Sequence, residues 1–100
     1  MKKRFIVCIE KSIKEQDKIF IDYLRNNSVG WWHWLSNTWL ISDPNGQLNS
    51  SILRDKLREI YNDERNIIFE ITNTQDTWSG FGPIAGEKNM FRWLKDNWKK

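Results

Sequence analysis

The sequence has one cysteine, one histidine and two prolines in 100 residues, and it lacks any long apolar run. The single cysteine, Cys8, cannot form a disulfide within this chain. With His33 as the only imidazole and Cys8 as the only thiol, a zinc site of the cysteine and histidine type is also excluded. No stretch approaches the roughly 20 apolar residues of a membrane-spanning helix, so we expect no association with a membrane.

Charge of neither sign dominates, because 16 basic residues stand against 13 acidic ones and leave a net charge of +3. The sequence therefore has no dense basic tail that would by itself indicate nucleic-acid binding. The basic start at Met1 is followed by an apolar stretch that ends at Glu10 and Lys11, too soon for a signal peptide. We interpret this stretch as a first strand and expect the protein in the cytoplasm.

Tryptophan is abundant, with seven in 100 residues. Such large flat rings suit three roles, namely packing in a core, contact with a second subunit, and stacking on nucleobases. We expect Trp39, Trp93 and Trp98 to anchor the core or the last helix. The remaining rings, in the segment 31–34 and at Trp78, are then candidates for a binding site.

The periodicity of the apolar residues predicts a single α+β domain over residues 1–100. The expected elements are a strand at Phe5–Ile9, a helix at Lys14–Asn26, strands at Val29–Leu35 and Asn37–Ser42, a helix capped by Asn49, Ser50 or Ser51, a strand at Ile67–Thr72 and a last helix containing Phe91, Leu94 and Trp98. This order matches the ferredoxin-like βαββαβ arrangement, with an antiparallel four-stranded sheet and an additional C-terminal helix. In it, helices cover one sheet face and leave the other for a partner.

The hairpin segment carries the first candidate site. Strand alternation sends Trp31 and His33 to one face, and Trp32 and Trp34 to the other. One pair should meet the core, while the other is left to stack on bases or to contact a second subunit. His33 is either a general base or phosphate contact, or a hydrogen-bonded strand residue.

The segment Asn73–Gly86 is the second candidate, since it is long, rich in glycine and without a predicted element. Its glycines let the backbone approach a flat ligand that Trp78 or Phe81 would cover. The alternative is that these two rings anchor the last helix. Lys11 and Ser12 complete the predicted ligand-binding residues.

Acidic residues suggest a different chemistry. Glu10 ends the first strand and Glu70 lies in the fourth, and these strands are neighbours in the predicted sheet. Their carboxylates are therefore candidates to share one magnesium ion. The alternative is that each is solvated or paired with a lysine or arginine.

Several motifs along the chain resemble the small SinR-like proteins, which are similar to the CRISPR-associated ferredoxin-fold subunit that accompanies the spacer integrase. The matching segments are Trp31-Trp32-His33, Thr38-Trp39-Leu40-Ile41, Ile52-Leu53-Arg54-Asp55-Lys56-Leu57, Trp78-Ser79-Gly80-Phe81 and Trp93-Leu94-Lys95-Asp96-Asn97-Trp98. The resemblance implies the same fold and a dimer that binds nucleic acid. It also implies a metal-dependent nuclease with an aspartate ending the first strand, where this chain has Glu10, whose carboxylate lies one methylene further out.

Together these observations predict a non-enzymatic protein that binds a nucleotide or nucleic acid, requires no cofactor, and forms a homodimer or higher homo-oligomer. A phage counter-defence protein that sequesters a signalling nucleotide is one form of this function. Two alternatives stay open. One is a magnesium-dependent nuclease that uses Glu10 and His33, and the other is a toxin-like or regulatory dimer whose tryptophans all lie in the core or interface.

Overall fold

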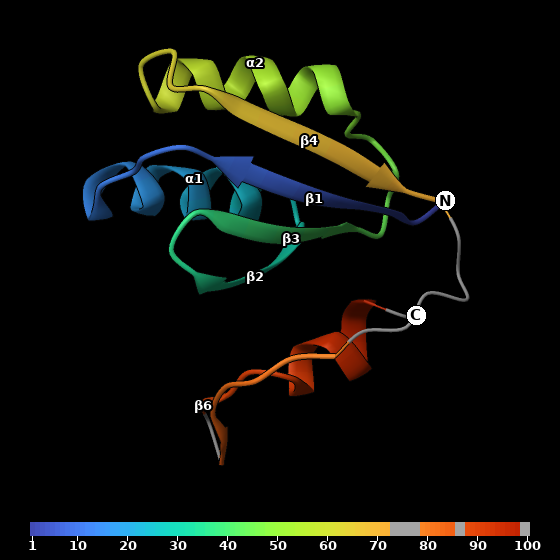
Figure 1. Cartoon of the computed structure of the whole chain (residues 1–100). Helices are drawn as coiled ribbons and strands as arrows, with labels where there is room; N and C mark the ends of the chain where they lie inside the picture. The colour runs from blue at the N-terminus through green and yellow to red at the C-terminus, as the bar shows by residue number, and fades with distance from the viewer. Residues whose placement is uncertain (73–78, 86–87, 99–100) are drawn as a thin grey trace.

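The computed structural model describes residues 1–72, 79–85 and 88–98. A four-stranded antiparallel sheet has the order β2-β3-β1-β4 (Figure 1). Its strands are β1 (Lys3–Ile9), β2 (Gly30–Leu35), β3 (Thr38–Asp43) and β4 (Asn66–Ile71), and the helices α1 (Lys14–Asn26) and α2 (Ser50–Ile60) cover one face. The α+β class and antiparallel sheet are confirmed, and the strand order and helix placement are compatible with a ferredoxin-like fold.

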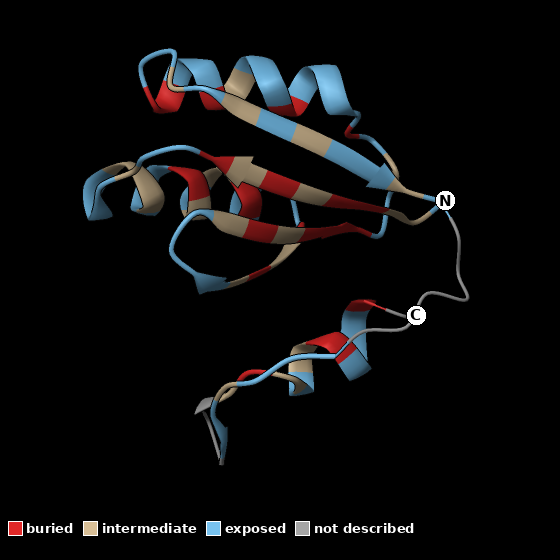
Figure 2. Ribbon diagram, viewed as in Figure 1, coloured by how far each residue is buried: buried red, intermediate tan, exposed pale blue. Residues whose placement is uncertain are grey.

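The main core lies between the sheet and the two helices. On α1 the buried residues Phe20 and Leu24 are four apart, and on α2 Leu53 and Leu57 have the same spacing, so each helix presents one apolar stripe. Trp39 on β3 has no exposed surface and meets the ring of Phe20 edge-on at a centroid distance of 4.8 Å. Buried residues therefore alternate along β1 and β3 where they face the helices (Figure 2).

Local capping explains where the helices begin. The side chain of Asn49 accepts a hydrogen bond from the backbone N–H of Ile52 at 2.8 Å, which makes Asn49 the N-cap of α2. At the start of α1, the N–H of Ile13 donates to the side-chain carbonyl of Gln16 at 3.2 Å. The chain therefore leaves β1 and enters α1 through the short segment 10–13.

The sequence pattern predicts that the face of the sheet opposite the helices is free for a partner. In the structure, another part of the same chain lies on this face. The C-terminal segment, residues 79–85 and 88–98, packs on it (Figure 1). Met90, Leu94 and Trp98 of this segment form a second apolar cluster with Trp32 of β2. The indole N–H of Trp32 donates to the carbonyl of Met90 at 2.7 Å. The predicted last helix is a short π-helical segment at Leu94–Trp98.

Part of the expected loop Asn73–Gly86 is structured. Strands β5 (Ile84–Ala85) and β6 (Lys88–Asn89) pair as a small antiparallel hairpin. Residues 73–78, which include the candidate Trp78, lie outside the described residues. Within the described part of the chain, no helix is both long and apolar enough to cross a membrane.

Candidate functional site: two depressions that share His33

Seven of the predicted site residues border two neighbouring depressions in the surface. The first, which we call the polar cleft, has a volume of about 800 Å³ and is bordered by Glu10, Lys11, Ser12 and His33. The second, which we call the tryptophan groove, has a volume of about 480 Å³ and is bordered by Trp31, Trp32, His33 and Trp34. His33 borders both, so one side chain separates the two candidate sites.

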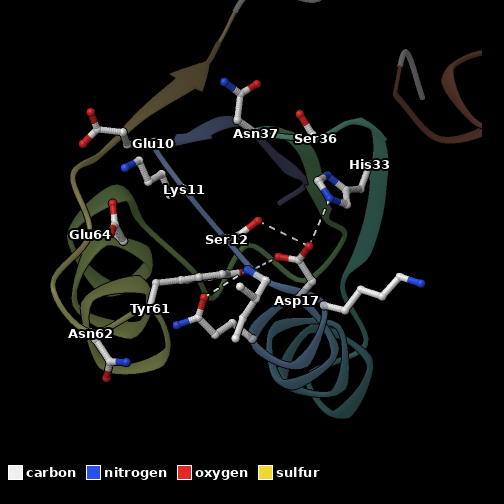
Figure 3. Close-up of a pocket in the computed structure, with 13 residues that line it drawn as sticks. Glu10, Lys11, Ser12, Asp17, His33, Ser36, Asn37, Tyr61, Asn62 and Glu64 are labelled. Atoms are coloured by element: carbon white, nitrogen blue, oxygen red, sulfur yellow. Dashed lines mark hydrogen bonds and ion pairs between the residues drawn. The ribbon is translucent and has the colours of Figure 1, made fainter.

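The polar cleft forms where β1 ends and α1 begins, with the β2–β3 turn and the end of α2 on its other sides (Figure 3). Asp17, on the first turn of α1, is its central side chain. One carboxylate oxygen accepts from the hydroxyl of Tyr61 at 2.8 Å, and the other lies 3.4 Å from Ser12 Oγ and 3.6 Å from His33 Nε2. Three separate elements are thus joined by one carboxylate.

The Tyr61 phenol is held in its neutral form. Burial raises the pKa of Tyr61, and the hydrogen bond to the Asp17 carboxylate raises this pKa further. The residue is only 1% exposed, so its hydroxyl depends on Asp17 as a partner. Tyr61 is therefore a fixed hydrogen-bond donor in the wall of the polar cleft.

His33 is held on three sides. Its ring stacks on the indole of Trp39, with the centroids 3.7 Å apart and the planes 5° apart. Nδ1 lies 3.0 Å from the carbonyl oxygen of Thr38, and Nε2 faces Asp17. Because a carbonyl only accepts, Nδ1 is the nitrogen that donates to Thr38, and Nε2 faces the Asp17 carboxylate rather than open solvent. The geometry favours the interpretation of His33 as a hydrogen-bonded strand residue.

Replacing Asp17 tests this network. We expect Asp17→Ala to lower the free energy of unfolding by about 1–3 kcal/mol, because the buried Tyr61 hydroxyl loses its acceptor. Urea denaturation measures the change. Asp22→Ala is the matched control on the same helix: its exposed carboxylate is 3.9 Å from Arg25, and we expect a change within about 0.5 kcal/mol. Equal losses in the two variants would contradict the role given to Asp17.

Glu10 does not fit a shared metal site. Arg65 Nε donates to its Oε1 at 2.6 Å and Arg65 Nη2 donates to its Oε2, so both carboxylate oxygens are engaged. This pairing lowers the pKa of Glu10. Pairing of β1 with β4 places Glu70 opposite Phe5, five residues from Glu10 and therefore roughly 16 Å along the strand. The prediction that Glu10 and Glu70 share one ion is wrong.

The described residues contain no group of three histidine, cysteine, aspartate or glutamate side chains that would hold a metal ion. Since Glu10 is paired with Arg65 and distant from Glu70, the residues at the end of β1 do not fit a magnesium site of the kind that the family resemblance implies. We derive no metal-dependent step from this geometry.

The tryptophan groove runs along β2, the edge strand of the sheet, between α1 and the C-terminal segment. Trp31 packs against the main core, whereas Trp32 is buried on the opposite face, as the alternation predicts. A register shift between Trp32 and Leu35 interrupts this alternation. Trp34 lies in that irregular stretch and remains 39% exposed.

Residues from outside the hairpin complete the groove. Arg92 and Trp93 line it from the C-terminal segment, and the guanidinium of Arg25 lies 5.7 Å from the ring centre of Trp31. Trp93 packs against the backbone of β2 at Gly30, where a Cβ would lie 3.4 Å from the indole, at ordinary van der Waals contact. The groove thus combines exposed aromatic surface with cationic side chains.

Sequence reasoning missed three of these contributors. Asp17 and Tyr61 are not among the site residues predicted from the sequence, although Asp17 lies in the first turn of α1, close to where β1 ends. Trp93 was assigned to an anchoring role, but it borders the tryptophan groove. The predicted residue Phe81 is 99% exposed and borders neither depression, since it lines a third, apolar cavity.

Comparison of the chain with protein-family models, with curated proteins and with solved structures found no match. The resemblance to the SinR-like proteins therefore stays a prediction from the sequence motifs.

Proposed function

We propose that this protein binds a nucleotide or a nucleic acid without catalysis, and that the bases stack in the tryptophan groove. The observation that supports the proposal is the exposed ring of Trp34 beside Trp93 and Arg92 in one groove. A nucleotide needs a flat apolar surface for its base and a cation for its phosphate. Trp34 supplies the first, and Arg92 supplies the second.

The expected interaction energies can be compared with the free energy that micromolar binding requires. Stacking of a base on an aromatic ring is worth about 1–3 kcal/mol, and a cation beside the ring adds to it. The net charge of +3 provides a further, weak attraction to phosphate. Two stacked bases supply about 2–6 kcal/mol, so the phosphate contacts must supply the remainder of the roughly 8 kcal/mol that micromolar binding requires.

Binding is favoured over the nuclease alternative. The carboxylate that would hold a metal is paired with Arg65, and both nitrogens of the imidazole that would assist face acceptors. Both groups are therefore engaged by other residues in the arrangement observed. We therefore give the groove, rather than the end of β1, the functional role.

Binding of fluorescently labelled oligonucleotides, followed by anisotropy, tests the proposal. We expect Trp34→Ala to weaken binding by about 5-fold to 100-fold, the equivalent of one lost stacking contact. Arg92→Ala should weaken binding and also reduce its dependence on salt. Phe81→Ala is the matched control, because this ring is more exposed than Trp34 but lies outside the groove. An equal loss for Phe81→Ala would move the site to the C-terminal segment, and absence of any binding would overturn the proposal.

Salt dependence and native mass spectrometry refine the ligand. Affinity for a polymer falls steeply with salt because many phosphates are contacted, whereas affinity for one nucleotide falls less. The homodimer predicted from the sequence belongs to this proposal. A native mass spectrum reads the subunit number and any retained nucleotide together, and a purely monomeric protein would contradict the dimer alone.

A further inference from the structure

A third cavity lies between the open face of the sheet and the C-terminal segment. Its volume is about 650 Å³, within the range of roughly 300–1,000 Å³ that is typical of small-molecule sites. Trp32 and Leu40 form its wall on the sheet, and Phe91, Leu94 and Trp98 form the opposite wall. Large apolar side chains therefore surround the space on two sides.

The lining of this cavity differs from that of the two depressions described above. Among the described residues that line it, none is charged, and only Thr38 and Ser79 carry a hydroxyl group. The polar cleft and the tryptophan groove, by contrast, are each bordered by charged side chains of both signs. A phosphate in the apolar cavity would lose its hydration without gaining a partner. The lining thus selects against nucleotides and in favour of an uncharged occupant.

Specific contacts hold the two walls at this separation. The hydrogen bond of 2.7 Å from Trp32 Nε1 to the Met90 carbonyl joins the sheet to the segment. Arg4 Nη1 donates to the carbonyl of Trp98 at 3.2 Å, and the guanidinium lies 5.3 Å from the centre of that indole. The segment also folds tightly on itself, since a Cβ on Gly80 would lie 2.8 Å from the ring of Phe91. The cavity is consequently a built feature of the fold.

We propose that this cavity is a binding site for an uncharged, flat, apolar small molecule. Aromatic walls at two sides favour a planar ring system, and burial of apolar surface supplies the affinity at about 25 cal/mol per Å². Among the described residues, the site shares only Trp32 with the tryptophan groove, and its test uses other positions, so it stands or falls independently of nucleotide binding. Occupation also bridges the sheet and the C-terminal segment, and it therefore stabilises the folded chain.

The neutral dye N-phenyl-1-naphthylamine, which becomes fluorescent in apolar surroundings, is the probe for this site. Thr38 on β3 and Ile67 on β4 both lie opposite Cys8 of β1, so they occupy one row on the same face of the sheet. Thr38 lines the cavity, whereas Ile67 does not and is 52% exposed. Thr38→Trp fills the cavity, and Ile67→Trp adds the same bulk outside it.

We expect the unaltered protein to bind one dye molecule per chain, saturably. Thr38→Trp should weaken dye binding by about tenfold or more, and Ile67→Trp by less than about twofold. Adenosine monophosphate should not displace the dye. Failure of the unaltered protein to bind saturably, equal effects of the two variants, or displacement by the nucleotide would each overturn the proposal.

Circular dichroism verifies that each variant is folded. Should Thr38→Trp fail to fold, Leu35→Lys and Phe69→Lys form a second matched pair, because both positions are about half exposed but only Leu35 lines the cavity. A charge at the cavity edge should weaken dye binding by about tenfold, and a charge at Phe69 should leave it unchanged. Equal dye affinity in these two variants would contradict the proposal.

Discussion

Trp39→Ala is expected to lower the free energy of unfolding by about 3–5 kcal/mol, which is the largest loss we predict for one side chain. The indole has no exposed surface, and it is packed between the edge of Phe20 and the stacked face of His33. Removing it leaves a cavity at the centre of the main core. Because domains of this size are stable by only about 5–15 kcal/mol, a substantial unfolded fraction should be visible by urea denaturation.

Trp39→Phe provides the comparison for this prediction. It retains an aromatic ring and removes an indole N–H that, among the described residues, is buried without a hydrogen-bond partner. We expect a loss of less than about half that of Trp39→Ala, since part of the lost packing is offset by removal of the unsatisfied donor. Equal losses in the two variants would show that ring packing in the core is not the dominant contribution of Trp39.

Asp43→Ala is expected to cost about 2–5 kcal/mol, the second large effect. Asp43 is 1% exposed, and its carboxylate accepts from the N–H groups of Asn45 at 3.1 Å and Leu48 at 2.8 Å. Its backbone carbonyl also accepts from the N–H of Gly46, which adopts a positive φ of 65°. These bonds shape the connection from β3 to α2. Without the carboxylate, two backbone donors lose their partner.

Amide hydrogen exchange locates this effect, and urea denaturation measures its size. In Asp43→Ala the Leu48 amide, which bonds directly to the carboxylate, should lose more protection than the amides of β1. Asp55→Ala is the control, because this carboxylate is 64% exposed and forms an ion pair with its neighbour Arg54 at 2.9 Å. We expect a change within about 0.5 kcal/mol for the control. Comparable losses for Asp43 and Asp55 would contradict the argument.

The central role of Trp39 connects stability with function. His33 stacks on Trp39 and separates the polar cleft from the tryptophan groove. A partial loosening of this stack would alter both depressions together. Trp34→Ala changes only an exposed ring in the groove, so it separates loss of binding from loss of stability.

Local patterns in the sequence were sufficient to predict the helices α1 and α2 and the strands of the main sheet. The spacing of Phe20 and Leu24 predicts the apolar stripe of α1, and Asn49 is a favourable N-cap whose side chain does accept from the first turn of α2. Alternation in the segment 31–34 predicts that Trp31 and Trp32 face opposite sides of the sheet, which the two apolar clusters confirm.

The candidate site depended on contacts between distant parts of the chain. Asp17 and Tyr61 are 44 positions apart, and no local pattern predicts that their side chains meet. The strand neighbours of Glu10 were predicted correctly, yet the antiparallel register places Glu70 at the other end of the pair. Register is decided by which side chains fit opposite one another, and a prediction of strand order does not contain it.

The sequence by itself determined α1, α2 and the four strands of the main sheet, because helical period, strand alternation and capping act within a few residues. Only the tertiary structure decided that the C-terminal segment packs on the open sheet face, that Trp93 joins the hairpin tryptophans, and that an apolar cavity lies beneath that segment. The physical reason is that burial of apolar surface is non-directional, so the partner of each exposed ring depends on how the whole chain packs.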